Sequence, residues 1–175
     1  MKPSLPSSET YVLIFDWGDT VMRDYGYPGK MSDWEQVDWI PGMEESLNQL
    51  FPDYFCCIAT SASHSTTPDM ILALSRVGAD RYFHRFFSST DLGFAKPDPM
   101  FFQSICNQLK VRANRCIMIG NLYDKDIVGA KKAGMKTILF NEKDEPGIYE
   151  LADIVLTSME MLPNAVEKLK FQLND

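Results

Sequence analysis

The sequence predicts an α/β domain of the Rossmann-like type, a three-layer sandwich in which a mainly parallel β-sheet lies between two layers of helices. Two observations lead to this prediction. Short apolar segments rich in β-branched and aromatic residues alternate along the chain with longer segments whose apolar residues recur every three or four positions. The length of 175 residues suits one domain with a single buried core and is too small for two full domains.

Six segments have the composition of buried strands. The first, Tyr11–Asp16 (YVLIFD), is an apolar run that ends in an aspartate, and the second, Phe55–Thr60 (FCCIAT), ends in a threonine. Continuous apolar runs of this length are typical of parallel strands that are covered on both faces. The other four are RFFSS around Phe87, Cys116–Gly120, Thr137–Phe140 and Asp153–Ser158.

Five further segments space their apolar residues three and four positions apart, as the buried face of a helix does. Parallel strands are joined by crossover connections that usually contain a helix, so we expect helices in these segments. In chain order they are Met43–Leu50, Pro68–Val77, Pro99–Leu109, Asp126–Ala133 and Leu162–Leu173.

Two parts of the chain lack such periodicity. Residues 1–9 are rich in proline and serine, which indicates a flexible N-terminus, so a single domain is expected over residues 10–175. Residues 21–41 contain two tyrosines, two tryptophans and several glycines and prolines, and they are too irregular for a crossover helix. We interpret them as a flap over the end of the first strand. Its aromatic side chains either pack the flap onto the domain or contact a ligand or partner.

The formal net charge of −7 argues against a general attraction to nucleic acid or anionic membranes. Any phosphate group must therefore be bound locally, by a metal ion, a lysine or backbone amides. The four cysteines have neither the spacing of a zinc site nor the density of a disulfide scaffold, which indicates reduced thiols. Because no apolar run resembles a secretion signal or a membrane span, we expect a soluble cytoplasmic protein.

Four short segments each lie at the expected end of a strand or start of a helix, where α/β proteins bind ligands. They are FDWGDTV (residues 15–21), IATS (58–61), AKPDP (95–99) and IGNLYDKDIVGAKKAG (119–134). Their order and spacing resemble the four sequence motifs of the haloacid dehalogenase-like (HAD) superfamily across nearly the whole chain. The resemblance implies a HAD-like fold. The stretches between the motifs are too short to hold a large cap domain.

The resemblance also implies roles for residues of the first three motifs. Asp16 would be the nucleophile, whose carboxylate attacks phosphorus and forms an acyl-phosphate. Thr60 and Ser61 would bind phosphoryl oxygens, and Lys96 would place a positive charge beside the phosphoryl group and the attacking carboxylate. Taken singly, these residues have simpler explanations, namely a solvated carboxylate, a helix or turn cap, and a solvated loop lysine.

The cofactor implied by the resemblance is Mg²⁺, which prefers an octahedral shell of oxygens with few carboxylates and several waters. Its expected ligands are the carboxylates of Asp16 and Asp126, the backbone carbonyl of Gly18 and the side-chain oxygen of Asn121. Asp126 alternatively caps the helix that follows it, and the two roles are compatible.

Two positions depart from the family pattern. Gly18 stands where most of the phosphatases carry a second aspartate that protonates the leaving alcohol and later activates water. Asp19 follows at once, and a glycine turn would allow it to take over this acid/base role. Asn121 replaces an aspartate of the fourth motif and lowers the negative charge at the metal site. Asp124 either compensates for that loss or is a solvated loop residue.

The sequence therefore leads us to expect a magnesium-dependent phosphomonoester hydrolase that works through an aspartyl-phosphate at Asp16. The alternative is a catalytically weakened HAD-like domain that binds phosphate or serves as a regulatory interaction module. The expected substrate is a phosphorylated small molecule or macromolecule. The sequence does not decide whether a second copy of the chain, in a homo-oligomer, covers the exposed site.

Overall fold

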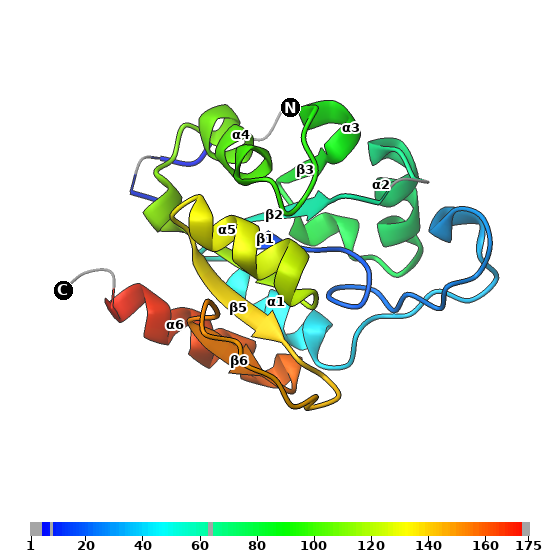
Figure 1. Ribbon diagram of the computed structural model, residues 1–175. Coiled ribbons are helices and arrows are strands. Elements are labelled where there is room, and N and C mark those ends of the chain that lie inside the picture. Colours follow the sequence, from blue (N-terminus) through cyan, green and yellow to red (C-terminus); the bar gives the residue numbers. More distant parts are fainter. Residues whose placement is uncertain (1–4, 8, 63–64, 173–175) are drawn as a thin grey trace.

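Six parallel strands form one sheet in the computed structural model, which describes residues 5–7, 9–62 and 65–172 (Figure 1). Their order across the sheet is β3-β2-β1-β4-β5-β6, and every neighbouring pair is parallel. The predicted Rossmann-like sheet is therefore confirmed. In chain order the strands are β1 (Val12–Phe15), β2 (Phe55–Thr60), β3 (Arg85–Ser88), β4 (Cys116–Gly120), β5 (Lys136–Phe140) and β6 (Ile154–Leu156).

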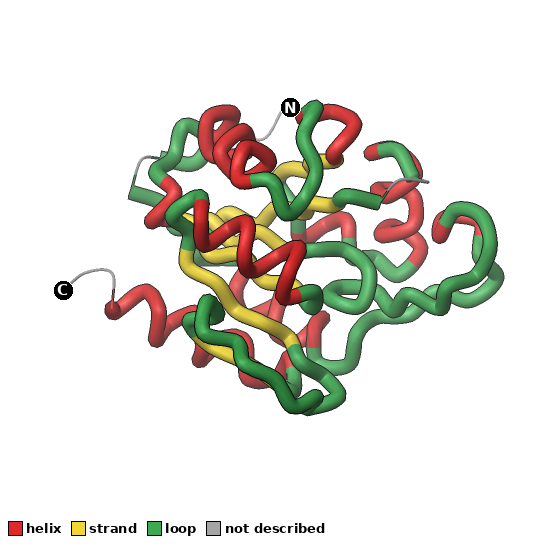
Figure 2. Tube along the Cα trace, in the orientation of Figure 1, coloured by secondary structure: helices red, strands yellow, loops and turns green. Residues whose placement is uncertain are grey.

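Helices cover both faces of this sheet, so that the strands lie between two helical layers (Figure 2). Helices α1, α2 and α6 pack on one face, and α4 and α5 pack on the other. All five predicted helices are present, whereas α3 was not predicted because four residues are too few to show a period. The helices are α1 (Met43–Leu50), α2 (Thr67–Arg76), α3 (Ser89–Leu92), α4 (Pro99–Leu109), α5 (Val128–Lys132) and α6 (Leu162–Gln172).

The central strand β1 contributes to the core on both faces of the sheet. Leu13 and Phe15 belong to one cluster of buried side chains, and Val12 and Ile14 belong to the other. Successive side chains of a strand point to opposite faces, so a strand covered on both sides must be apolar at every position. This is why β1 shows a continuous apolar run. The same burial fixes the position of the polar residue that follows the strand.

The start of α4 fixes the loop that carries the third motif. Asp98 caps this helix through a hydrogen bond that its carboxylate accepts from the backbone N–H of Met100 at 2.8 Å. Pro99 occupies the first helical position, where its missing N–H costs nothing. Lys96 therefore lies two residues before the N-cap of a well-defined helix.

The flap, residues 21–41, is irregular as predicted, with a single 3₁₀ turn at Met31–Asp33. It extends beside α2, as the blue and light-blue segment at the right of Figure 1. The guanidinium of Arg76, the last residue of α2, donates hydrogen bonds to the flap carbonyls of Ser32 (3.0 Å), Glu35 (3.2 Å) and Trp34. In the residues that the structure describes, neither the β1–β2 nor the β2–β3 connection contains a cap domain.

Some expectations fall outside the described residues or are only partly covered by them. Residues 1–4 and 8 of the N-terminal segment that we expect to be flexible lie outside, as does Leu173 at the end of the last predicted helix. The four cysteines are buried free thiols, as predicted. None of the helices in residues 5–7, 9–62 and 65–172 is a candidate membrane span.

Candidate active site

Three strand ends meet at one edge of the sheet and bring the motif residues together. Strand β1 lies between β2 and β4, with Phe15 paired to Ile58 on one side and to Ile119 on the other. Asp16 continues this pairing, because its backbone N–H donates to the carbonyl of Ile119 at 2.9 Å. Parallel strands end at the same edge, so Asp16 lies beside the ends of β2 and β4.

Lys96 joins two buried carboxylates at this edge. Its Nζ lies 2.7 Å from Oδ1 of Asp16 and 2.7 Å from Oδ1 of Asp126. The side chains of Lys96, Asp16 and Asp126 are 2%, 13% and 1% exposed. The second carboxylate oxygen of Asp126 accepts a hydrogen bond from the backbone N–H of Leu122 at 3.0 Å. Asp126 is thus positioned from both sides.

Two glycines of the fourth motif permit this arrangement by letting other groups approach the backbone. A Cβ on Gly120 would lie 2.3 Å from Oδ2 of Asp126, and a Cβ on Gly129 would lie 2.3 Å from the carbonyl oxygen of Pro97. Neither contact is sterically allowed. Any larger residue at these positions would therefore displace Asp126 or the loop that carries Lys96.

Burial and neighbouring charges shift the pKa values of the central pair. Burial raises the pKa of Asp16 to about 6, Lys96 opposes this change, and the negative charge of Asp126 adds to it. For Lys96, burial acts to lower the pKa, but Asp126 and Asp16 together outweigh burial and the pKa is raised. At neutral pH the site therefore holds an ionised Asp16 next to a lysine ammonium group.

These residues open onto a cavity of about 410 Å³ between the strand ends and the flap. The strand ends supply Asp16, Thr60 and Ser61, and the third and fourth motifs supply Lys96 and Asp126. The flap contributes the opposite wall. The other lining residues are Trp17, Gly18, Asp24, Gly26, Tyr27, Gly29, Met31, Trp34, Ala62, Ser65, Leu122 and Lys125.

The two hydroxyl groups at the end of β2 are oriented by backbone contacts. Oγ1 of Thr60 accepts a hydrogen bond from the N–H of Ala62 at 3.1 Å, and Thr60 is almost fully buried. Oγ of Ser61 accepts a hydrogen bond from the N–H of Lys96 at 2.9 Å. Each oxygen therefore serves as an acceptor inside the protein, which leaves its hydroxyl proton for another acceptor.

The structure does not bring Asp19 or Asn121 into this cavity. Both line a neighbouring cavity of about 440 Å³. Asp19 has a φ of 53° in a tight turn, and its carboxylate accepts from the backbone N–H of Asp24 at 3.0 Å and faces Arg23 at 3.4 Å. Oδ1 of Asn121 accepts a hydrogen bond from Oγ1 of Thr20 at 3.3 Å. The turn places Asp19 against the neighbouring cavity and not against the one that Asp16 lines.

Asp24 is a site residue that the sequence did not reveal. It lies in the flap and lines the cavity together with Asp16. Its Cβ and its Oδ2 are each 3.4 Å from the position that a Cβ would have on Gly18. No motif or spacing marks Asp24, because an irregular loop determines where it lies.

The oxygen atoms of this site supply part of the ligand shell that a hard divalent cation requires. Asp16 and Asp126 supply two carboxylates, Gly18 lines the same cavity, and a single lysine leaves the pair with excess negative charge. In the described part of the chain, no three Asp, Glu, His or Cys side chains form a metal site by themselves. A cation here would therefore need backbone and water oxygens. Asn121, the fourth expected ligand, lines the neighbouring cavity and not this one.

Comparisons with known proteins agree with this geometry. The family model described as haloacid dehalogenase-like hydrolase matches residues 14–140, which is more than half of the chain. A ribulose-1,5-bisphosphate 5-phosphatase from Halopiger xanaduensis is 28% identical over 72% of this chain and 52% of its own length. The (S)-2-haloacid dehalogenase 4A of Burkholderia cepacia is 30% identical over 71% of this chain and 52% of its own length.

The chain thus spans about half the length of these curated relatives. Among solved structures, a protein from Listeria monocytogenes serotype 4b has the same fold, with a TM-score of 0.80. That likeness covers 92% of this chain and 99% of the other at 23% identity. The parallel sheet, the four motifs at its edge and the match over residues 14–140 together show that the chain belongs to the haloacid dehalogenase-like hydrolase family.

Proposed function

We propose that this protein is a magnesium-dependent phosphomonoester hydrolase that forms an aspartyl-phosphate at Asp16. The observation that carries the proposal is the contact of 2.7 Å between Lys96 Nζ and Asp16 Oδ1 at the base of an open cavity. A carboxylate held beside a buried ammonium group is ionised at neutral pH and is ready to attack. The same ammonium group offsets the charge of an incoming phosphate.

Each neighbouring residue has a role in this proposal. Thr60 donates its hydroxyl proton to a phosphoryl oxygen, since its oxygen already accepts from Ala62. Ser61 positions the loop of Lys96 through the bond at 2.9 Å and contributes to the phosphate-binding surface. Lys96 neutralises charge that builds up on the transferring group. The positioning of Lys96 therefore depends on residues from three strand ends.

Asp16, Asp126 and the Gly18 carbonyl would hold the metal ion, with waters in the remaining positions. When bound, Mg²⁺ would lower the repulsion between the attacking carboxylate and the phosphate dianion. Lys96 would then act as the second cationic group of the site. Asn121 lines the neighbouring cavity, so we leave it out of this ligand set.

The test is hydrolysis of an aryl phosphate with magnesium and with a chelator. Activity should require magnesium and should fall to background in Asp16→Asn. The matched control is Asp53→Asn, because Asp53 is an exposed aspartate in the loop before β2. Activity in the chelator, or full activity in Asp16→Asn, would contradict the proposal.

Two rival functions are tested by companion measurements on the same protein. The Burkholderia cepacia relative is a dehalogenase, so chloride release from a 2-chloro acid would favour that chemistry for this chain. We favour phosphate because the cavity is lined by Lys96 and Lys125 and by the hydroxyls of Thr60 and Ser61. A catalytically weakened module would bind a phosphate mimic without turning over any substrate.

A further inference from the structure

Gly18 leaves a space next to the nucleophile that its own backbone does not require. Its φ is outside the left-handed region, so a residue with a side chain can adopt the same backbone conformation. Leaving the chain neighbours aside, the three heavy atoms nearest to a Cβ built on Gly18 all belong to Asp24, at 3.4 to 3.8 Å. The flap therefore places a carboxyl group beside the point where a side chain on residue 18 would begin.

The contacts of Asp24 orient this carboxyl group. Its backbone N–H donates to Asp19 Oδ1 at 3.0 Å, and its own Oδ1 accepts from the N–H of Gly26 at 2.8 Å. The other oxygen, Oδ2, is the one that lies 3.4 Å from the Cβ position on Gly18. Asp24 is exposed and lines the cavity that contains Asp16. One oxygen is thus held by the flap, and the other is left for a substrate.

We infer that Asp24 is the general acid and base of the reaction at Asp16, supplied by the flap in place of a side chain at position 18. This inference rests on the proposed phosphatase function. Asp19 then has a different role. It is a positioning residue that holds the backbone of Asp24 through the bond at 3.0 Å.

The reaction has two steps, and Asp24 transfers a proton in each. In the first step an oxygen of Asp16 bonds to phosphorus and the bond from phosphorus to the leaving oxygen breaks. The protonated Asp24 gives its proton to that oxygen, so that a neutral alcohol leaves. In the second step water attacks phosphorus and the Asp16–phosphorus bond breaks. The Asp24 carboxylate takes one proton from the water, which regenerates both residues and releases phosphate.

Leaving groups of different acidity test the first step. An alkyl leaving group, with a conjugate-acid pKa of ~15, needs protonation, whereas an activated phenol near ~7 leaves with little help. We expect Asp24→Asn to slow single-turnover phosphorylation by alkyl phosphates by ~100-fold or more and by the aryl phosphate by less than about threefold. With the aryl substrate, the variant should release a burst of about one phenol per enzyme and accumulate phosphoenzyme, since water activation is also lost.

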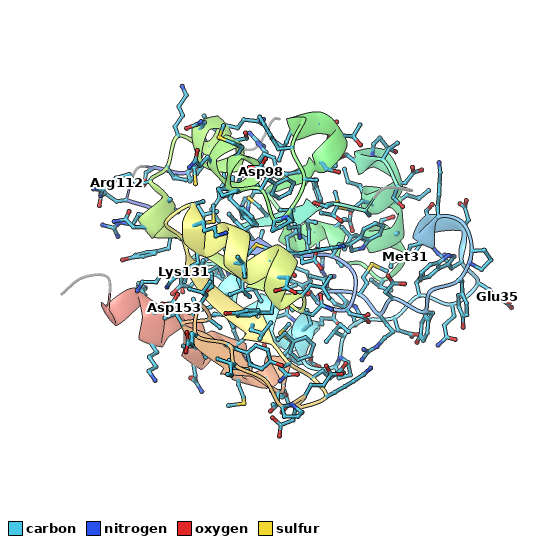
Figure 3. All side chains as sticks on the ribbon, in the orientation of Figure 1. Met31, Glu35, Asp98, Arg112, Lys131 and Asp153 are labelled. Atoms are coloured by element: carbon cyan, nitrogen blue, oxygen red, sulfur yellow. The ribbon has the colours of Figure 1, made fainter. Side chains whose placement is uncertain are left out.

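Asparagine is a conservative replacement at this position, because its side-chain oxygen can still accept from Gly26. The control is Glu35→Gln, since Glu35 is a flap carboxylate that points away from the body of the molecule (Figure 3). This control should match the unmodified protein on both substrates. Asp19→Asn tests the competing assignment. If Asp19→Asn and not Asp24→Asn produces the selective loss on alkyl phosphates, the inference is overturned.

Moving the carboxyl group from position 24 to position 18 provides a further test. The double variant Gly18→Asp with Asp24→Asn should react with alkyl phosphates at least tenfold faster than Asp24→Asn alone, because it returns a carboxyl group to the same region. Equal losses on both substrates in Asp24→Asn, or no loss, would overturn the role of Asp24 while leaving the phosphatase function intact. An unmodified protein that hydrolyses neither substrate would instead refute the proposed function and this inference with it.

Discussion

At the scale of single residues, the site combines charges that do not favour folding. Asp16 and Asp126 are two buried carboxylates that share one ammonium group at 2.7 Å from each. The desolvation of such groups often exceeds the attraction between them, so a buried ion cluster is a weak contributor to stability. The arrangement is easier to explain by catalysis, for which a desolvated carboxylate beside a cation is useful.

This cost predicts that Asp16→Asn stabilises the metal-free protein at neutral pH. Burial raises the pKa of Asp16 from 3.8 in the unfolded chain to about 6 in the folded one. The folded state therefore binds the proton more tightly. The stability that this proton provides is present below pH 4 and is lost as the pH rises through 6. Asp16→Asn does not lose this stability. The difference in free energy of unfolding between the variant and the unmodified protein should therefore grow over that interval to at most ~3 kcal/mol.

Urea unfolding in the presence of a chelator, at several pH values between 4 and 8, measures this difference. Asp53→Asn is the control, because Asp53 is exposed and its variant should parallel the unmodified protein. An Asp16→Asn advantage that does not change with pH would show that the folded-state pKa of Asp16 is not raised.

At the scale of elements, the flap is the part whose position the function needs most. Its attachments to the domain include the hydrogen bonds from Arg76 of α2 and two hydrogen bonds of 2.7 Å each from Arg23 to Glu142. The second contact joins the flap to the loop after β5. Because Asp24 and Tyr27 line the cavity, these attachments contribute to the shape of its outer wall.

We expect Arg76→Met to loosen the flap without unfolding the domain. The substitution removes hydrogen bonds to three flap carbonyls, which are solvated once the flap opens, so the global loss should be about 1 kcal/mol. Limited proteolysis within residues 21–41 should become faster, and KM should rise several-fold. Arg112→Met serves as the control, since Arg112 lies on the other side of the molecule from the flap residue Glu35 (Figure 3). Unchanged proteolysis and KM would show that Arg76 does not hold the flap.

The sequence predicts the regular elements more closely than it predicts the flap. The helix α4 was predicted to the residue, since Asp98 and Pro99 mark its start and its apolar period is regular. Strand ends located Asp16 and Thr60 equally well, because parallel pairing places them at one edge. Asp24 was out of reach, because it lies in an irregular segment whose position depends on contacts with distant residues, such as that of the adjacent Arg23 with Glu142. The π-helical turn at Tyr123–Ile127 likewise produces no sequence period of its own.

At the scale of the whole molecule, the site must bind an anion in an acidic protein. The net charge is −7, and the cavity lining itself contains three carboxylates and two lysines. A phosphate dianion would therefore meet excess negative charge unless a cation binds with it. Binding of the anion and binding of magnesium should depend on each other for this electrostatic reason.

This dependence yields a prediction for trifluoroberyllate, which mimics an acyl-phosphate on Asp16. Magnesium alone or trifluoroberyllate alone should change the melting temperature little, since each leaves part of the charge uncompensated. Both together, at about 100 times the dissociation constant, should stabilise the fold by ~2.7 kcal/mol. For a chain of this length, that is a rise of about 5–10 °C.

Differential scanning fluorimetry of four samples measures this effect, with neither component, with each alone and with both. Asp16→Asn should lose the combined shift because it removes the atom to which beryllium binds, and Lys96→Met should lose it because it removes the cation beside that atom. Asp24→Asn should retain most of it, because proton transfer plays no part in forming the adduct. Additive shifts from the two components would contradict the mutual dependence. A full shift in Asp16→Asn would mean that the anion binds elsewhere, and the assignment of Asp16 as the nucleophile would then fail.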